Sequence, residues 1–132
     1  MAAITLYPHA AAEYASFTSG GLAEAANYLG LARGGWVYVA LGNDDTTPAI
    51  TDTGLGNEIV RAAATYTRSS ATVTFTLTWT ATVAFTCKEF GVFDAGMGGN
   101  CLYHRLTASQ AVVVGDVCTL RDSIIVAQGT YA

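Results

Sequence analysis

The longest regular pattern in the chain is an alternation of apolar residues and threonine over residues 71–85 (ATVTFTLTWTATVAF). Apolar side chains fill the odd positions from Val73 to Phe85, and threonine fills the even positions from Thr72 to Thr82. A period of two is typical of a β-strand with one face on a core and the other half exposed. The pattern therefore predicts a long antiparallel strand whose odd-numbered side chains are buried.

A single straight strand over this whole run would be too long for the domain. Fully extended, it would span roughly 50 Å, whereas a compact chain of this size is about 35–40 Å wide. We therefore expect the strand to bend or break near Ala81 and Thr82.

Shorter apolar runs separated by turn residues predict further strands. These runs cover residues 4–7, 36–41, 55–67, 88–94, 101–106, 110–114 and 117–127. Residues 36–41 (WVYVAL) are apolar on both faces of a strand, so both faces are expected to be covered. A polar loop at 42–54 and turns at 68–70, 95–100 and 115–116 carry the Gly, Asp, Asn, Pro and Ser residues that favour such connections.

The N-terminal part has helical rather than strand periodicity. Alanine-rich residues 9–19 predict a short helix that places Tyr14 and Phe17 on one face, and residues 22–31 predict a second one. The chain is therefore expected to be mainly β, an antiparallel β-sandwich of about seven or eight strands with a short helical N-terminal segment. We expect one domain over residues 1–132, with the helical segment at 1–35 and the sandwich at 36–132.

Composition favours a protein that assembles with partners. Hydrophobic residues make up 52% of the chain and charged residues only 12%, about half the usual charged share. A net charge of −4 with one lysine, Lys88, argues against nucleic-acid binding, which needs clustered cations. There is no apolar run of membrane-spanning length and no signal-peptide pattern, so we expect no membrane contact and synthesis in a cytoplasm.

The three cysteines, Cys87, Cys101 and Cys118, do not have the spacing of a metal site. Buried free thiols that act as small apolar residues are the main interpretation. Pairing of the odd thiol with a neighbouring subunit is the alternative.

No stretch predicts catalytic, cofactor-binding or metal-ligating residues. His9 and His104 are the only histidines, and each is expected to be at the surface or satisfied by neighbours. The chain has no G-x-S-x-G motif, and the glycines at 95–100 lack the lysine and the helix of a phosphate loop. We therefore expect the protein not to be an enzyme.

Two polar features suggest further chemistry only weakly. Asp44, Asp45 and Asp52 offer oxygen ligands for calcium, but their spacing does not match an EF-hand loop, so solvated carboxylates are the simpler interpretation. A threonine array on several adjacent strands is typical of ice-binding surfaces, but the sequence shows such an array on one strand only. Ordinary cross-strand threonine contacts explain it more simply.

Several short segments follow one another in a recognisable order. A strand ending in ALG runs into an Asp- and Pro-containing loop, followed by the pattern D-T-x-L-x-x-E-x-x-R at Asp52, Thr53, Leu55, Glu58 and Arg61. An E-x-G-x-F-D-A strand and a glycine turn come next, at Glu89, Gly91, Phe93, Asp94, Ala95, Gly98 and Gly99. From about residue 36 onward, the chain resembles small virion proteins of tailed phages, which include capsid decoration (cement) proteins and tail-fibre or tail-tip proteins.

This resemblance implies a virion structural protein of a tailed bacteriophage, with a capsid decoration protein as the leading expectation. A tail-fibre or tail-tip component is the alternative, and a carbohydrate-binding β-sandwich module is the alternative of another class. The implied partners are the protein itself, as a trimer, and other virion proteins such as a major capsid protein. The implied location is the virion, after assembly in the host cytoplasm.

Candidate subunit contacts follow from side-chain type. Tyr14, Phe17 and Trp36 offer aromatic surface. Glu58 and Arg61 lie three residues apart, and an ion pair between them would contribute little at a free surface but would set the register at a subunit contact.

Overall fold

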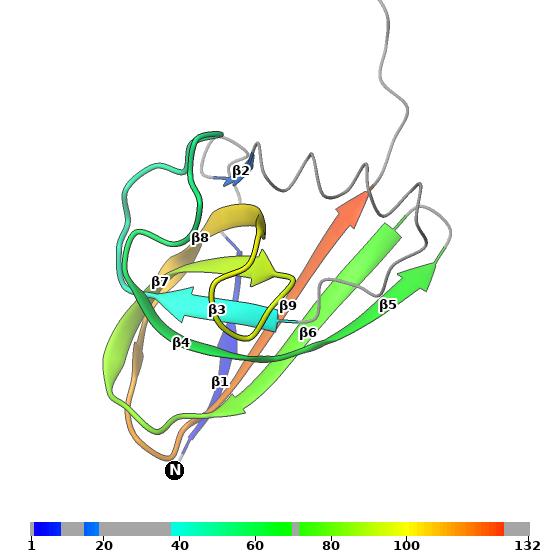
Figure 1. Ribbon diagram of the computed structural model, residues 1–132. Helices are drawn as coiled ribbons and strands as arrows, with labels where there is room; N and C mark the ends of the chain where they lie inside the picture. The colour runs from blue at the N-terminus through cyan, green and yellow to red at the C-terminus, as the bar shows by residue number, and fades with distance from the viewer. Residues whose placement is uncertain (1, 9–14, 19–37, 70–71, 126–132) are drawn as a thin grey trace, which may run out of the picture.

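The computed structural model describes residues 2–8, 15–18, 38–69 and 72–125. In this part of the chain, nine strands form two packed sheets (Figure 1). The four-stranded sheet has the order β1–β9–β6–β5, and the five-stranded sheet has the order β2–β8–β7–β3–β4. The strands are β1 (Ala3–Leu6), β2 (Ala15–Phe17), β3 (Tyr38–Gly42), β4 (Glu58–Ala63), β5 (Thr65–Ser69), β6 (Thr72–Thr80), β7 (Phe85–Phe93), β8 (Cys101–Val112) and β9 (Val117–Ile125). The predicted β-rich sandwich is confirmed.

The predicted helical N-terminal segment is not supported. Residues 15–17, which belong to the helix expected at 9–19, form strand β2 and pair antiparallel with residues 103–105 of β8. A short alanine-rich helix is marginal by itself, and pairing at a sheet edge satisfies the same backbone groups. That expectation was wrong for these residues, and the rest of the predicted helices lies at residues outside the described ranges.

The long alternating run breaks where its length required. Strand β6 ends at Thr80 in the four-stranded sheet, and β7 begins at Phe85 in the five-stranded sheet. The connection is tied to the β8–β9 turn, because the Ala81 N–H donates to the Asp116 carbonyl (2.8 Å) and the Gly115 N–H donates to the Ala81 carbonyl (2.9 Å). Val83 lies in this connection and is 41% exposed, so the predicted burial of odd positions fails there.

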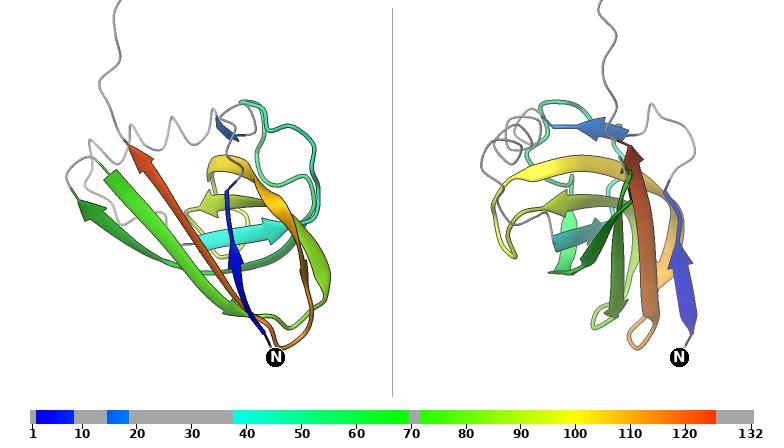
Figure 2. Two further views of the ribbon diagram at one scale, coloured as in Figure 1. Left: turned by 180° about the vertical axis from the view of Figure 1, so that it is seen from behind. Right: turned by 90° about the vertical axis from the view of Figure 1, so that its right-hand side faces the viewer.

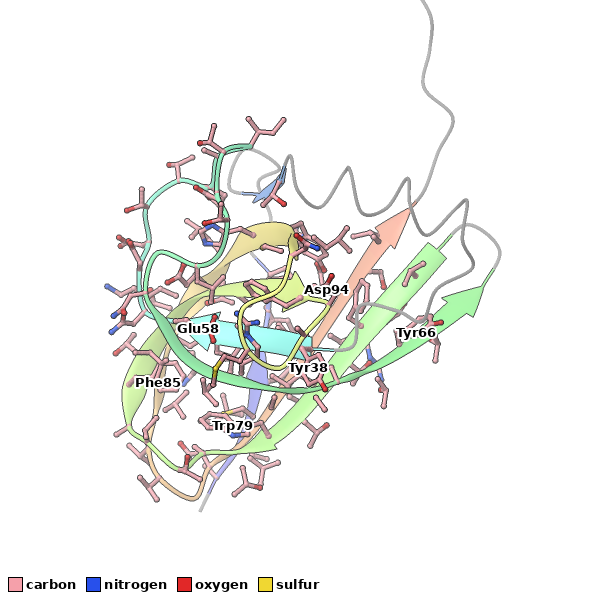
Figure 3. All side chains as sticks on the ribbon, viewed as in Figure 1. Tyr38, Glu58, Tyr66, Trp79, Phe85 and Asp94 are labelled. Carbon is pink, nitrogen blue, oxygen red and sulfur yellow. The ribbon has the colours of Figure 1, made fainter. Side chains whose placement is uncertain are left out.

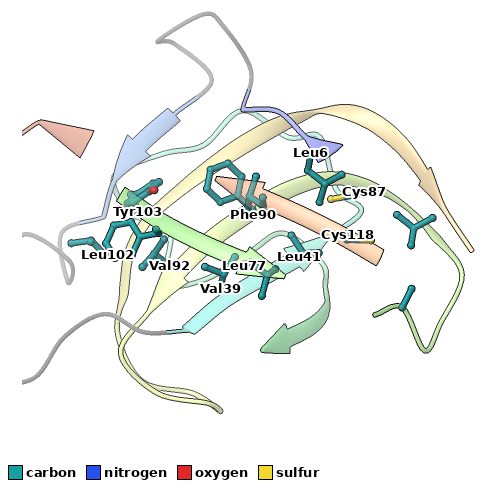
Figure 4. Close-up of a cluster of buried hydrophobic side chains, with 14 residues drawn as sticks. Leu6, Val39, Leu41, Leu77, Cys87, Phe90, Val92, Leu102, Tyr103 and Cys118 are labelled. Atoms are coloured by element: carbon teal, nitrogen blue, oxygen red, sulfur yellow. The ribbon is translucent and has the colours of Figure 1, made fainter. Parts of the chain in front are cut away.

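The core between the sheets is built from the inward faces of both. Phe75 and Leu77 of β6 are buried as predicted, and they meet apolar side chains from β1, β3, β7, β8 and β9. Figure 4 shows the centre of this cluster, which includes Leu6, Val39, Leu41, Leu77, Phe90, Val92, Leu102 and Tyr103. Near one end of the sandwich, the rings of Trp79 and Phe85 close the core, with centroids 6.2 Å apart (Figure 3).

All three cysteines are free and buried, in agreement with the main interpretation. Cys87 and Cys118 lie in the core between the sheets (Figure 4), whereas Cys101 belongs to a smaller cluster with Ala40 and Phe93. Burial raises the pKa of Cys87 to about 11 and that of Cys101 to about 12. The thiols therefore remain protonated and shielded.

The long loop between β3 and β4, residues 43–57, folds over the outer face of the five-stranded sheet. Leu55 of this loop packs on the small cluster formed by Ala40, Phe93 and Cys101. Strand β3 is thus covered on both faces, as its sequence predicted. Figures 1 and 2 show the loop projecting beside the carboxyl end of β3.

The two sheets are joined along one side by an almost continuous strand. Strand β4 pairs with β3, and after Ala64 the chain continues as β5, which pairs with β6 in the other sheet (Figure 2). On the opposite edge of the four-stranded sheet, β1 runs parallel to β9. Its place agrees with the edge strand predicted at residues 4–7.

Candidate functional site

A buried carboxylate organises the loop at residues 43–57. Glu89 lies on the outer face of β7, and its side chain has no exposed area. Its oxygens accept hydrogen bonds from the backbone N–H groups of Asp44 (3.0 Å), Gly56 (2.8 Å) and Asn57 (2.8 Å). Glu89 therefore holds both ends of the loop against the sheet.

His104 connects this carboxylate to the middle of the loop. Its imidazole is 4% exposed, with Nε2 lying 2.8 Å from Glu89 Oε1 and Nδ1 lying 2.8 Å from Asp52 Oδ2. The same oxygen of Asp52 accepts the N–H of Ala49 at 2.9 Å. His104 is thus satisfied by neighbours, as expected, but through two carboxylates that the sequence did not indicate as partners.

The pKa shifts of this pair favour the charged forms of both groups. Burial acts to lower the pKa of His104, but the hydrogen bonds and charges of Glu89 and Asp52 outweigh it and raise that pKa above the ordinary value. Burial likewise acts to raise the pKa of Glu89, and the hydrogen bonds from His104 and the loop N–H groups bring it below the ordinary value. With a carboxylate oxygen 2.8 Å from each ring nitrogen, His104 is placed to donate from both nitrogens, as the imidazolium form does.

A pocket of about 300 Å³ opens between the loop and His104. Hydroxyl groups are frequent in its lining, and the described residues that line it include no Phe, Tyr or Trp: Asp44, Thr46, Thr47, Thr51, Asp52, Thr53, Gly54, Leu55, Gly56 and His104. A pocket of this size is at the lower end of the range for small-molecule sites.

His104 is not available as a general base in this arrangement. Both ring nitrogens of His104 are engaged by carboxylates, so the imidazole has no free lone pair with which to activate a nucleophile. Within the described ranges, no group of three or more His, Cys, Asp or Glu side chains is placed to hold a metal ion. The three aspartates weighed as calcium ligands have other partners: Asp44 accepts from Thr46, Asp52 pairs with His104, and Asp45 lies 3.9 Å from Lys88.

Of the predicted subunit contacts, the structure describes the side chains of Glu58 and Arg61 only. Tyr14 and Trp36 lie outside the described residues, and Phe17 is described only through its backbone pairing with Tyr103.

The expected ion pair between Glu58 and Arg61 is present, with Nη2 of the arginine 2.7 Å from Oε1 of the glutamate (the side chain of Glu58 is labelled in Figure 3). The sequence did not indicate that Arg61 also binds the glycine turn at 95–100. Its Nη1 donates to the carbonyls of Ala95 (3.0 Å) and Gly98 (2.6 Å), and its guanidinium lies 3.7 Å from the centre of the Phe93 ring. Gly98 and Gly99 adopt the positive φ angles that this turn requires.

The threonine array extends further than the sequence indicated. The register of β6 with β5 and β9, and of β9 with β1, brings hydroxyl side chains of four strands to the outer face of the four-stranded sheet. We call this the hydroxyl face; its members are Thr5, Thr65, Thr67, Thr74, Thr76, Thr78, Thr80, Thr119 and Ser123. Arg121 is the one charged side chain that the described register places among them. The expectation of an array on a single strand was wrong, because the sequence of one strand does not show which residues of other strands pair beside it.

Sequence reasoning also missed Glu89 and Asp52 as partners of His104, since the residues lie far apart in the chain. A weak signal was present in the strand KEFGVFD, where Glu89 shares a face with Gly91 and Phe93. A charged residue in an otherwise apolar, two-sided strand indicates a buried polar partner on that face.

The comparisons with known proteins identify a family for this chain. No helix among the described residues has the length and apolar character to cross a membrane. Neither the curated proteins nor the solved structures compared with the chain give a match. A family model described as "Podophage GP4 fiber I protein gp80" matches residues 31–128, which is well over half of the sequence. The chain therefore belongs to the family of podophage GP4 fiber I protein gp80.

Proposed function

We propose that the protein is a structural component of the tail fibre of a podophage. The observation that carries this proposal is the family match, which spans nearly all of the described sandwich and names a fibre protein. The family supports the phage virion role expected from the sequence, and it favours the tail-fibre alternative over a capsid decoration protein.

The chemistry of the described residues supports a role without catalysis. The buried histidine is held between two carboxylates, and the three thiols are shielded in apolar surroundings. A β-sandwich whose long loop is fixed by hydrogen bonds is suited to transmitting force and presenting surfaces in an assembly.

The location in the particle is tested by electron microscopy with antibodies raised against the purified chain. The proposal expects gold labels on appendages at the tail and none over the capsid shell. Labels distributed over the shell would overturn it in favour of a decoration protein. Particles lacking the gene product provide the second arm, since a fibre protein leaves the capsid intact and removes the appendage.

Self-association as a trimer is the second part of the proposal. The hydroxyl face supports it, because a broad sheet face with Arg121 as its one described charge offers little electrostatic opposition to a second copy. Light scattering of the purified chain, with and without reductant, tests the mass. A trimer in both conditions is expected, Thr78→Lys should shift it toward the monomer, and a monomer in both conditions contradicts this part.

A further inference from the structure

The pocket bounded by residues 44–56 and His104 has the features of a preformed ligand site. The loop around it is fixed by side chains rather than left to solvent: Glu89 binds three of its N–H groups, and Asp52 binds His104. At the loop's base, the Asn57 side chain donates to the Asn43 side-chain oxygen at 2.7 Å. A pocket with walls held in this way loses little conformational entropy when a ligand binds.

Two glycines allow this close packing. A methyl group at Gly91 would lie 2.8 Å from Leu55 Cδ2, so only glycine lets the loop approach the sheet there. A methyl group at Gly56 would lie 2.6 Å from Asp44 Cγ. The absence of a side chain at Gly91 and Gly56 therefore leaves room for Leu55 and Asp44 at their positions in the pocket lining.

Several polar groups that line the pocket are left without a hydrogen bond to the described residues of the loop. Among the described residues, no hydrogen bond involves Asp44 Oδ2, Asp52 Oδ1 or the hydroxyls of Thr47, Thr51 and Thr53. The carboxylate oxygens only accept hydrogen bonds, whereas the threonine hydroxyls both donate and accept. A ligand that satisfies all of them must carry both hydrogen-bond donors and hydrogen-bond acceptors.

The charges restrict the ligand further. Of the described residues that line the pocket, His104 is the basic one, and both of its ring nitrogens already face carboxylates. A phosphate, sulfate or carboxylate ligand would therefore be repelled by Asp44 and Asp52, and the N–H groups of His104 would not be free to bind it. An ammonium ligand would satisfy the carboxylates but would leave the threonine hydroxyls without an acceptor.

We propose that this pocket binds a neutral saccharide unit. Vicinal hydroxyls of a sugar can donate to the free oxygens of Asp44 and Asp52 and accept from the threonine hydroxyls, while the threonine methyls and Leu55 contact its C–H faces. The described part of the lining offers no Phe, Tyr or Trp ring on which a sugar could stack, which predicts weak binding by each single site. The proposal concerns the isolated chain and stands independently of the fibre assignment.

The test is saturation-transfer difference NMR on the full chain with a panel of neutral sugars: glucose, galactose, mannose and N-acetylglucosamine. Galacturonate serves as the acidic counterpart of galactose, and choline serves as the cationic probe. The double variant Thr51→Val/Thr53→Val removes two exposed hydroxyls at nearly constant shape. Thr80→Val makes the same change on the hydroxyl face, away from the pocket.

The expected result is binding of at least one neutral sugar, with weaker or no binding of galacturonate and choline. The double variant should weaken the affinity roughly thirtyfold, because it loses two hydrogen bonds worth about 1 kcal/mol each, and Thr80→Val should leave it unchanged. Failure of every neutral sugar to bind would overturn the proposal. So would preferential binding of choline or galacturonate, or equal affinity of the double variant, since folding of each variant is checked by its unfolding midpoint.

Discussion

Nε2 of His104 lies 2.8 Å from Oε1 of Glu89, and this pair is buried under a loop on the outside of a sheet rather than in the core between the sheets. The two residues come from the neighbouring strands β8 and β7. Because Glu89 also binds three loop N–H groups, the ion pair and the loop form one hydrogen-bonded unit. The shape of the loop therefore depends on buried polar contacts as well as on the apolar packing of Leu55.

Replacing Glu89 by glutamine should destabilise the fold markedly. The substitution keeps the shape but leaves a buried imidazolium with one carboxylate fewer, and loss of one partner of a buried pair costs about 3–5 kcal/mol. We expect a decrease of about 3 kcal/mol in the free energy of unfolding, measured by urea denaturation. Asp45→Asn is the matched control, since Asp45 is 75% exposed and its contact with Lys88 is long. Equal effects of the two substitutions would show that the buried pair does not hold the loop.

The same pair should give stability a characteristic pH dependence. The pKa of His104 is raised above 6.5, so its contribution is fully present below about pH 6.5 and is lost as the pH rises through the raised value. The pKa of Glu89 is lowered below 4.5, so its contribution is present above about pH 4.5 and is lost as the pH falls through the lowered value. Both contributions are complete between these two ordinary values.

The pH dependence that comes from His104 is measured by unfolding the unmodified chain and the His104→Asn variant in urea over a pH series. The stability advantage of the unmodified chain should be largest between about pH 4.5 and 6.5 and should shrink at higher pH. Asp122, whose pKa is raised by burial, titrates in both proteins and so leaves the difference unaffected. A difference that stays constant with pH would mean that His104 has the same pKa in the folded and unfolded chain.

Local patterns in the sequence were enough to predict most of the strands but not the site. The alternation around Phe75 and Leu77 defined a buried face, and the length of the run required the break that occurs at Ala81. These features follow from period and chain geometry alone. The strand at residues 15–17 was mistaken for a helix because its partner, β8, is far away in the sequence.

The site depends on contacts that no local pattern reports. Asp52, Glu89 and His104 meet only after the loop has folded over β7 and β8, and the register that aligns Gly91 with His104 is set by the whole sheet. The hydroxyl face has the same origin, since Thr119 joins Thr78 through the pairing of β9 with β6. In both cases tertiary pairing decides which residues share a face.

The thiols should be unreactive in the native protein. Cys87 and Cys118 have no exposed area, Cys101 is 3% exposed, and burial raises the pKa of all three. Because the thiolate is the reactive form, Ellman's reagent should label none of them under native conditions and all three in guanidinium chloride. Rapid labelling of one thiol in the native state would contradict this burial. It would instead support the alternative that this thiol pairs with a neighbouring subunit.

Arg61 should stabilise the glycine turn at residues 95–100 of its own chain. Its side chain is 8% exposed and binds Glu58 as well as two carbonyls of the glycine turn. Lysine cannot reproduce this planar set of donors. Arg61→Lys should therefore lower the free energy of unfolding by about 1–2 kcal/mol, and it should speed amide hydrogen exchange at residues 95–100.

The exposed Arg121 provides the control, since Arg121→Lys should change neither quantity. The same variants also test the earlier expectation that Arg61 is a subunit contact. A stabilising role within the chain predicts that Arg61→Lys loosens the turn whatever the mass measured by light scattering. A loss of mass with unchanged stability and unchanged exchange would instead place Arg61 between subunits. The turn would then be held by Asp94 and Asn100, which are linked by three hydrogen bonds.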